Sequence, residues 1–479
     1  MKINEETVIN ILSSCEFFTD KENPLDVYVR YTDTYGVKRF VSTKNREFRV
    51  FVRDCYRNTE DTFIAPILDG YIQAFEDDAI VHKQETGVQI YRRLSGDLTN
   101  RIIYNLANHK GQTVHITAEG WKIKSNSTVH FLVHPLDIPQ APPIPGGDLA
   151  TLLQPYINLK GQEFLLFLVY LISCFIRSDH FIAILTGAQG SGKSSTTKII
   201  RELIDPNKLV INALPNTRSD LVTLLAANFL VCFDNTNQQF SENISDLLCA
   251  AVTGVTDAKR RLFSDSELVV LNLHNTVVLN GINAIPKKAD FAERSLLFEM
   301  KKLEKTEYQS KTDLAQRFTA DKPLILGAIF DTLSRAMSIR KNIVVQKRHR
   351  MADAHLNMLA IAMALGIKQE KFQAILDANN KKLQNAYAEQ NQLIEALKHF
   401  MGSQTRVSGS ATRIYRLIFD SIVGDKSFFP KSASALTRKL NEEREAIEAA
   451  GLRVIQGKTA VANTLEIKKI PQNQMKSVK

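Results

Sequence analysis

The chain has 479 residues, of which 44% are hydrophobic and 23% charged, and its formal net charge is +10. A globular chain of this length exceeds what one hydrophobic core serves, so we expect two to four domains. The five cysteines show no CxxC or Cys/His metal spacing, and the N-terminus has no apolar run; both features argue against a secreted disulfide scaffold and favour the reducing cytoplasm. The longest apolar run, 164–176, is too short to cross a bilayer and predicts a buried helix. The basic balance favours a polyanionic partner.

Short alternating or apolar runs fill the first part of the chain. We expect strands at 27–31, 48–52, 113–116 and 129–133, and therefore a β-rich, α+β accessory or collar domain over residues 1–134. Five prolines follow within 135–147. Because proline interrupts regular structure, this segment predicts an interdomain linker.

A helical segment from about 149 to 176 leads into an apolar strand at 181–185 and then into a complete phosphate-binding loop. This loop consists of Gly187, Ala188, Gln189, Gly190, Ser191, Gly192, Lys193 and Ser194, with Ser195 directly after it. In such a loop backbone N–H groups face the phosphate oxygens, the lysine reaches the β and γ phosphates, and the serine hydroxyl ligates Mg²⁺. We therefore expect ATP and Mg²⁺ as cofactors; the alternative is a chance match in a loop rich in glycine and serine.

Two further apolar strands end in polar side chains. The strand 229–233 is followed by Asp234, and the strand 275–279 by Asn280. A buried strand brings its C-terminal side chain to the phosphate loop, where Asp234 would hold the Mg²⁺ shell together with Ser194. Asn280 would contact the γ phosphate or the attacking water as a sensor. The alternatives are an aspartate that caps the next helix and an Asn-Gly turn.

Asn235 lies where many ATPases of this kind carry a glutamate that polarises the attacking water. An amide orients water but cannot accept its proton, so either hydrolysis is slower or a carboxylate from elsewhere is the base. Arg294 follows Asn280 by 14 residues and precedes another apolar strand. It is the candidate arginine finger, which in ring ATPases reaches the nucleotide of a neighbouring subunit. The alternative is a surface salt bridge to Glu293 or Asp290.

Residues 257–270 have the pattern of a strand, a polar turn and a second strand. Such a hairpin would project into the central channel of a ring and bring cations to a DNA backbone. The candidate contacts are Lys259, Arg260 and Arg261, with Lys287 and Lys288 in the next loop. A solvated charged turn is the competing interpretation.

Helix-rich sequence covers about 322–401, and the Ser- and Gly-rich segment 402–409 marks a second boundary. Residues 402–479 hold 14 Lys or Arg against 7 Asp or Glu. Helical segments at 412–421 and 432–450, followed by strands at 452–455 and 465–469, have the order of a winged-helix module. Its second helix would offer Arg438 and Lys439 to DNA, and its wing Lys458. The alternative is a helical cap whose charges are solvated.

The ordered set of phosphate loop, Asp234 strand, basic hairpin, Asn280 and Arg294 resembles the AAA+ ATPase cores of superfamily 3. It is most similar to the self-loading replication-initiator helicases of phages and phage-satellite mobile elements. Strings similar to those of that group occur at 278–282, 350–354 and 120–123, so the resemblance covers about residues 90–400. Asn235 departs from the Asp-Glu or Asp-Asp pair that is common there.

The resemblance implies a multidomain α/β protein with an AAA+ core and helical lid over 148–401 and a winged-helix-like domain over 402–479. It implies a hexameric ring of identical subunits with ATP at their interfaces, DNA in the channel and Arg350 as a second sensor in the lid. It also implies replication proteins of a bacterial host as partners, in that host's cytoplasm. The implied function is ATP-driven DNA unwinding at a replication origin. The rival interpretations are an ATP-regulated DNA-binding initiator that does not unwind and a small-molecule kinase.

Overall fold

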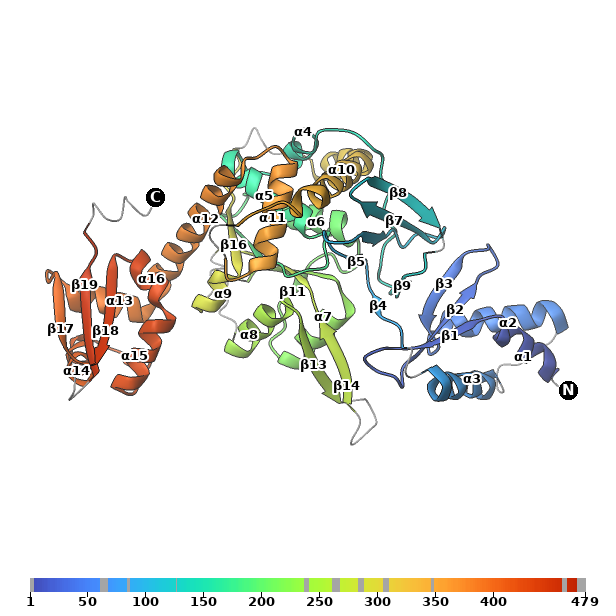
Figure 1. Cartoon of the computed structure of the whole chain (residues 1–479), viewed down its shortest axis with the longest axis horizontal. Coiled ribbons are helices and arrows are strands. Elements are labelled where there is room, and N and C mark those ends of the chain that lie inside the picture. Colours follow the sequence, from blue (N-terminus) through green and yellow to red (C-terminus); the bar gives the residue numbers. More distant parts are fainter. Residues whose placement is uncertain are drawn as a thin grey trace.

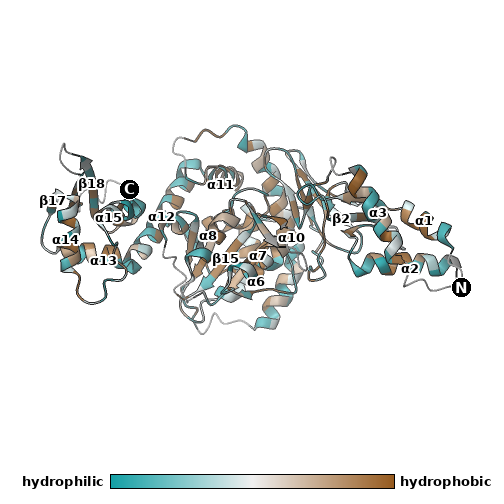
Figure 2. Cartoon of the chain, turned by 90° about the horizontal axis from the view of Figure 1, so that it is seen from below, coloured by the Kyte–Doolittle hydropathy of each residue, from teal (hydrophilic) through white to brown (hydrophobic). Residues whose placement is uncertain are grey.

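The computed structural model describes residues 4–60, 68–83, 87–125, 127–236, 241–260, 268–282, 288–304, 310–345, 349–458 and 463–471. Three units follow one another along the long axis of the molecule (Figure 1). Each has its own cluster of buried hydrophobic side chains. Hydrophobic segments are concentrated inside the central unit, around β15, α7 and α8 (Figure 2). The protein is therefore a mixed α/β molecule with several cores.

The N-terminal unit packs three helices against a three-stranded antiparallel sheet of order β1-β2-β3. Its elements are α1 (Glu5–Ser13), β1 (Glu16–Thr19), β2 (Val27–Thr32), β3 (Lys38–Ser42), α2 (Arg46–Glu60) and α3 (Leu68–Lys83). Alternate residues of β2, Val27, Val29 and Tyr31, are buried in the cluster. This is the period of two that a sheet with one covered face requires.

The strand expected at 48–52 is wrong, because these residues lie in helix α2. Phe48, Val52 and Tyr56 are all buried, whereas Val50 is exposed. Their spacing of four is the helical period, so the apparent alternation within five residues was too short a window to separate helix from strand.

Six short strands connect the N-terminal unit to the phosphate-loop region. They are β4 (Ile90–Tyr91), β5 (Leu94–Gly96), β6 (Ile102–Asn105), β7 (Gln112–Thr117), β8 (Gly120–Ser125) and β9 (His130–Phe131). Strands β5-β6-β7-β8 form an antiparallel sheet whose buried side chains belong to the central cluster. A buried ion pair also joins this region to the centre, with Arg93 Nε 3.0 Å from Asp205 Oδ1. The hydrophobic cluster of the N-terminal unit thus ends at Ile80 and the central cluster begins at Leu94, so the two cores meet well before the expected boundary at residue 134.

The proline-rich segment 135–147 lies along the central unit in extended form. Its backbone N–H groups at Ile138 and Ile144 donate to the carbonyls of Pro206 and Pro323. The side chain of Gln140 is buried and donates to the carbonyl of Leu203. The prolines therefore exclude helix, as expected, but the segment is fixed to the core and is not a free linker.

The central unit is built on a five-stranded parallel sheet of order β11-β12-β15-β10-β16. Its strands are β10 (Ile182–Thr186), β11 (Asn212–Ala213), β12 (Leu230–Asp234), β15 (Thr276–Gly281) and β16 (Ser295–Glu299). The strands are apolar throughout their middle because helices bury both faces of a parallel sheet. The carboxyl ends of β10, β12 and β15 meet at one edge of the sheet.

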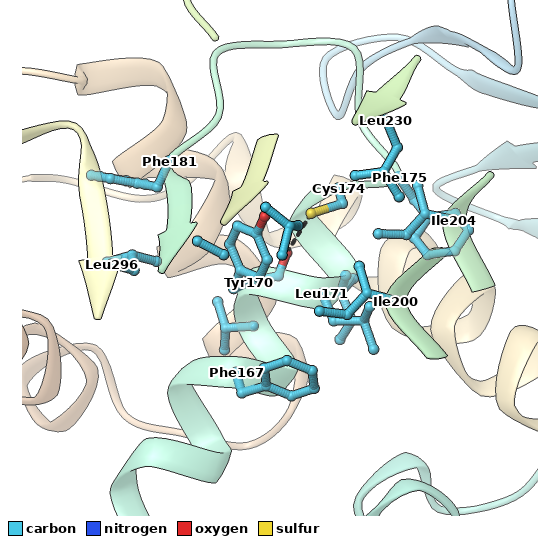
Figure 3. Close-up of a cluster of buried hydrophobic side chains, with 14 of the residues drawn as sticks. Phe167, Tyr170, Leu171, Cys174, Phe175, Phe181, Ile200, Ile204, Leu230 and Leu296 are labelled. Carbon is cyan, nitrogen blue, oxygen red and sulfur yellow. Dashed lines mark hydrogen bonds between the residues drawn. The ribbon is translucent and has the colours of Figure 1, made fainter. Parts of the chain in front are cut away.

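Helices and one 3₁₀ turn surround this sheet. They are α4 (Leu149–Leu153), η2 (Gln154–Tyr156), α5 (Gly161–Ser173), α6 (Lys193–Ile204), α7 (Arg218–Ala227), α8 (Glu242–Ala251), α9 (Ala289–Glu293), α10 (Lys311–Arg340), α11 (Ala352–Ala364) and α12 (Gln369–Gln390). The apolar run 164–176 forms most of the buried helix α5, as expected. Its residues Phe167, Tyr170 and Leu171 pack among side chains of β10, α6, β12 and β16 (Figure 3). No helix in the described part of the chain is long and apolar enough to cross a membrane.

A two-stranded hairpin projects from the central unit (Figure 1). Strand β13 (Val255–Arg260) pairs antiparallel with β14 (Leu268–Leu273), from Val255–Leu273 to Arg260–Leu268. The two strands expected within 257–270 are therefore present. The tip of the hairpin, 261–267, lies outside the described residues.

The C-terminal unit begins within α12, because Tyr387 and Ala388 already belong to its cluster. It contains α13 (Gln392–Met401), β17 (Arg406–Ser410), α14 (Ala411–Ser421), α15 (Ala433–Glu442), α16 (Arg444–Ala449), β18 (Leu452–Lys458) and β19 (Asn463–Lys469). Its antiparallel sheet has the order β17-β19-β18. The segment 402–409, expected to be a boundary, contributes the strand β17, and the single helix expected at 432–450 is divided into α15 and α16.

Candidate nucleotide-binding site

The phosphate loop joins the end of β10 to the start of α6 through a backbone that only glycine adopts readily. The φ angles are +148° at Gly187, +81° at Gly190 and +88° at Gly192. A Cβ atom on Gly187 would lie 2.2 Å from the carbonyl oxygen of Met300. The glycines are thus required by geometry, and they bring the N–H groups of the first turn of the 12-residue helix α6 to the pocket.

The ammonium group of Lys193 lies across the loop. Its Nζ donates to the carbonyls of Gly187 and Ala188 at 2.7 and 2.9 Å, and to Ser191 Oγ at 3.4 Å. Burial lowers the pKa of Lys193, and the nearby carboxylate of Asp234 opposes that shift. The arrangement offers one cation to the phosphate oxygens that such a loop holds.

Asp234 ends β12 beside the first turn of α6. Ser194 Oγ donates to Asp234 Oδ2 at 3.3 Å, and the other carboxylate oxygen accepts from the backbone N–H of Asn235 at 2.7 Å. No group of three or more His, Cys, Asp and Glu side chains suited to a metal occurs among the described residues. A Mg²⁺ ion that binds with a nucleotide needs only one or two protein oxygens, because water and phosphate complete its octahedron. Ser194 and Asp234 fit that requirement.

Asn280 connects the other polar groups of the site. Its buried side chain donates from Nδ2 to Thr197 Oγ1 at 3.0 Å, and its Oδ1 accepts from the backbone N–H of Asn235 at 3.4 Å. Thr197 Oγ1 in turn donates to the carbonyl of Lys193 at 3.0 Å. Asn280 therefore bridges the phosphate helix and the Asp234–Asn235 turn. It lies within the strand β15, so the turn interpretation of Asn280 does not hold.

Lys193, Ser194 and Asn235 open onto a cavity of about 1000 Å³, whereas Asp234, Thr197 and Asn280 lie behind its lining. One wall is formed by the loop and the first turn of α6, and the rest comes from segment 154–160, from the ends of β12 and β15, and from residues 303, 311 and 314. The lining residues are Gln154, Pro155, Tyr156, Ile157, Asn158, Lys160, Gln189, Gly190, Ser191, Gly192, Lys193, Ser194, Ser195, Thr196, Asn235, Gly281, Ile282, Leu303, Lys311 and Leu314. This lining contains no Asp or Glu among the described residues. The carboxylate of Asp234, next to Asn235 in the chain, is already bonded to Ser194 and to the backbone N–H of Asn235.

Several of these residues were not found from the sequence. Asn158 donates from Nδ2 to the carbonyls of Ser191 (3.0 Å) and Lys301 (2.7 Å) and so holds the phosphate loop from outside. Asn158 belongs to no recognisable motif. Only the fold brings it, two residues after the end of η2, next to the phosphate loop. Thr197 could have been found, because it lies one helical turn after Lys193.

Arg294 lies at the opposite end of the sheet from the phosphate loop. It directly precedes β16, and Ser295 pairs with Ile182 at the start of β10. Its guanidinium is 3.4 Å from Asp290 and 3.4 Å from Thr253 Oγ1, and its side chain is 18% exposed. The salt bridge to Asp290 that the sequence left open is thus present.

Arg350 does not line the cavity and is not brought to the phosphate loop of its own chain. It pairs with both Asp290 and Glu293, and its side chain is 50% exposed. The structure therefore gathers two arginines around the short helix α9 at the far end of the sheet.

The candidate DNA contacts near the hairpin are placed only in part. Lys259 and Arg260 lie in strand β13, whereas Arg261 and Lys287 lie outside the described residues. Lys288 is paired with Asp246 at 2.8 Å and with Glu242 at 3.5 Å. These ion pairs make Lys288 a weaker candidate for a phosphate contact.

The candidate contacts in the C-terminal unit lie on α15 and at the end of β18. Arg438 is 78% exposed, and Lys458 is exposed. Lys439 is half-buried, and its Nζ lies 3.1 Å from Glu443 Oε1. Arg438 and Lys458 are therefore accessible, whereas Lys439 is 43% exposed and must exchange its contact with Glu443 to reach a phosphate.

Comparison with known proteins adds one match to this geometry. The family described as "Actinomycete integrative conjugative element replication protein" matches residues 152–382. The central unit is thus similar to a family of replication proteins. The matched segment is just under half of the chain and contains the phosphate loop, Asp234, Asn280 and Arg294.

No curated protein matches the chain. Two solved apo structures of the NrS-1 C-terminal region are similar to it over nearly their whole length. The first has 11% identity and a TM-score of 0.42, covering 98% of this chain and 100% of that one. The second has 10% identity and a TM-score of 0.40, covering 97% and 98%.

Proposed function

We propose that this protein is an ATP-driven DNA helicase that initiates replication. The observation that carries the proposal is the joint geometry of Lys193, the Ser194–Asp234 pair and the buried Asn280 beside the cavity that Lys193 and Ser194 line. These groups fit the phosphates, the magnesium ion and the γ-phosphate contact of a bound ATP. The similarity of residues 152–382 to replication proteins supports the biological setting.

The order of the strands supports an AAA+ core. Strand β15, which carries Asn280, is inserted between the phosphate-loop strand β10 and the Asp234 strand β12. The sensor therefore lies between the loop and the acidic residue, as the resemblance to AAA+ ATPases of superfamily 3 implies. In this proposal six copies form a ring, ATP binds at the interfaces, and the β13–β14 hairpin faces DNA in the channel.

The C-terminal unit supports a DNA-binding role. Helices α14 and α15 are followed by the β18–β19 hairpin, and β17 completes the sheet on the far side of β19. We assign this arrangement to a winged helix, with α15 as the recognition helix and the β18–β19 connection as the wing. Arg438 and Lys458 would contact phosphates, and the local positive charge would make that binding dependent on salt.

The test is an unwinding assay on forked DNA with the wild type and the Lys193→Ala variant. We expect the wild type to separate the strands with ATP and Mg²⁺ and the variant to lose at least about 100-fold in rate, because the phosphate charge is no longer neutralised. Equal behaviour of the two proteins with excess ATP would overturn the proposal.

A second function is favoured by a specific observation. Asn235, together with cavity-lining residues that include no carboxylate in the described part of the chain, fits slow hydrolysis, in which ATP controls the assembly of a DNA-bound initiator that does not unwind. Under this alternative ATP promotes DNA binding and oligomer formation, and no strand separation accompanies it.

A further inference from the structure

Helix α12 belongs to two hydrophobic cores at once. Phe372, Ile375, Leu376 and Leu383 are buried in the central cluster, whereas Tyr387 belongs to the cluster of the C-terminal unit. The helix runs without a break from one unit to the other (Figure 1). A displacement of the C-terminal unit is therefore transmitted to whatever α12 holds in the central unit.

In the central unit, α12 is attached to the strand that follows Arg294. The side chain of Asn379 bonds both backbone groups of Leu297 in β16, accepting from N–H at 3.0 Å and donating to the carbonyl at 2.6 Å. Lys382 pairs with Glu299 at the end of the same strand, at 2.8 Å. These bonds attach α12 to β16, the edge strand of the sheet, so we expect α12 and β16 to move together.

At its other end, α12 takes part in a buried chain of polar contacts. The hydroxyl of Tyr387 donates to Glu443 Oε2 at 2.5 Å and accepts from Asn391 Nδ2 at 2.9 Å. Ala289, the first residue of α9, packs against the hydrophobic cluster that contains Tyr387. Glu443 is 1% exposed, and its second oxygen is held by Lys439 at 3.1 Å. The chain of contacts therefore runs from α15 through Glu443 and Tyr387 to α9, whose Asp290 pairs with Arg294.

We propose that Tyr387 and Glu443 are positioning residues that transmit DNA contact at Lys439 to α9 and Arg294. The inference rests on the proposed function, because it takes α15 as the recognition helix and Arg294 as the interface arginine. Lys439 lies 3.1 Å from the buried Glu443 and 3.6 Å from the more exposed Glu442, and a DNA phosphate would compete with both carboxylates for its ammonium. When a DNA phosphate attracts the Lys439 ammonium, Glu443 remains buried but loses this cationic partner. The contacts around Tyr387 then rearrange, and the start of α9 moves with them.

The experiment measures hydrogen exchange of α9 with and without short duplex DNA at low salt. In the wild type, DNA changes the exchange of the backbone amides in 289–293. The Tyr387→Phe variant keeps the ring in the core but has no hydroxyl, so DNA binds within about twofold of the wild-type affinity while α9 no longer responds. Tyr415→Phe, which removes a hydroxyl from the same hydrophobic cluster, is the matched control and keeps the response.

Two further variants test the direction of the transmission. Lys439→Ala removes the cation from Glu443, so its α9 exchange without DNA should equal that of the DNA-bound wild type. Glu443→Gln keeps an acceptor for Tyr387 but needs no cation, so α9 should not respond to DNA. This variant decides the matter if Tyr387→Phe does not fold.

The outcomes separate the two proposals. The proposed transmission is overturned if DNA changes the hydrogen exchange of α9 equally in the wild type, Tyr387→Phe and Glu443→Gln. It is also overturned if DNA does not change the exchange of α9 in the wild type. A wild type whose α9 responds to DNA but which neither hydrolyses ATP nor unwinds DNA would overturn the proposed function and leave the transmission standing.

Discussion

Asn235 adopts a left-handed backbone conformation, with φ of +54°, at the turn that follows Asp234. Asparagine and aspartate tolerate this region far better than other side chains that could follow the acidic strand. The residue lines the cavity, and its backbone N–H bonds both Asp234 and Asn280. Its position is thus suited to contact an attacking water, but an amide has no basic oxygen with which to take the proton.

We expect Asn235→Asp to increase the turnover of ATP. Aspartate keeps the left-handed backbone and replaces the amide by a general base, which is worth roughly 10²-fold or more where it is well placed. Steady-state ATP hydrolysis at saturating ATP and Mg²⁺ is the measurement, and Asn235→Ser serves as the control without a base. A rate for Asn235→Asp no higher than that of the wild type would contradict the expectation that the missing carboxylate at this position limits turnover.

His180 makes the stability of the central unit depend on pH. It is buried at the start of β10, and burial, together with the nearby His274, lowers its pKa from 6.5 to about 3. Below pH 6.5 His180 is protonated in the unfolded chain but remains neutral in the folded chain. The free energy of unfolding therefore decreases as the pH is lowered from about 6.5 to about 3. His180→Leu removes this dependence.

The prediction is checked by urea unfolding of both proteins at pH 7 and pH 5.5. Between these values the wild type should lose roughly 1 kcal/mol more of its unfolding free energy than His180→Leu, since one fully shifted group changes it by about 1.4 kcal/mol per pH unit. Parallel losses in the two proteins would assign the acid sensitivity to other groups.

At the scale of elements, helix α10 contains a glycine that is required by a close contact with a neighbouring segment. A Cβ atom on Gly327 would lie 1.7 Å from the carbonyl oxygen of Ile144, in the extended segment that crosses α10. We expect Gly327→Ala to lower the free energy of unfolding by about 1–3 kcal/mol through this overlap, despite the better helix propensity of alanine.

Gly70, in helix α3, is the matched control for that change. A Cβ atom there meets no atom within 4 Å. Gly70→Ala should therefore be neutral or stabilise its unit by up to about 1 kcal/mol. Thermal unfolding of both variants gives the comparison, and equal effects would mean that the close approach of Ile144 relaxes at little cost.

The sequence predicted best the elements whose pattern is long or whose chemistry is local. Strands β10, β12 and β15 were expected because each is apolar and ends at a polar residue, and the loop glycines because a phosphate cradle needs them. Helix α2 was misassigned because five residues cannot separate a period of two from one of four. The sequence does not show which hydrophobic cluster the segment 94–116 and helix α12 join, because this depends on tertiary packing and not on the composition of either segment.

The candidate site divides in the same way. Lys193, Ser194, Asp234 and Asn280 lie together, because parallel strands present their carboxyl ends at one edge of the sheet. The wall from Gln154 to Asn158 and the residues Leu303 and Leu314 come from segments without a motif. Their role follows only from their position beside the loop. The pairing of Arg350 with Asp290 and Glu293 likewise depends on the fold and has no sequence motif.

At the scale of the whole molecule, the sheet separates two chemical surfaces. The phosphate loop follows Thr186 at the carboxyl end of β10, whereas Arg294 precedes Ser295, which pairs with Ile182 at the amino end. Four residues of extended strand separate these ends by roughly 13 Å. The guanidinium also bonds Thr253 and Asp290 in the direction away from the loop. Arg294 therefore cannot serve the nucleotide of its own chain without leaving these partners.

This separation predicts complementation between two inactive variants. In a ring, Lys193→Ala subunits lack a working phosphate loop but keep Arg294, and Arg294→Ala subunits have the reverse defect. When the two are mixed in equal amounts and assembled at random, about one quarter of the interfaces combine an intact loop with an intact arginine. DNA-stimulated ATP hydrolysis should recover toward that fraction of the wild-type rate. If Arg294 instead acts within its own chain, no interface is repaired and the mixture stays as inactive as either variant alone, so the recovered rate distinguishes an arginine shared between subunits from a structural ion pair.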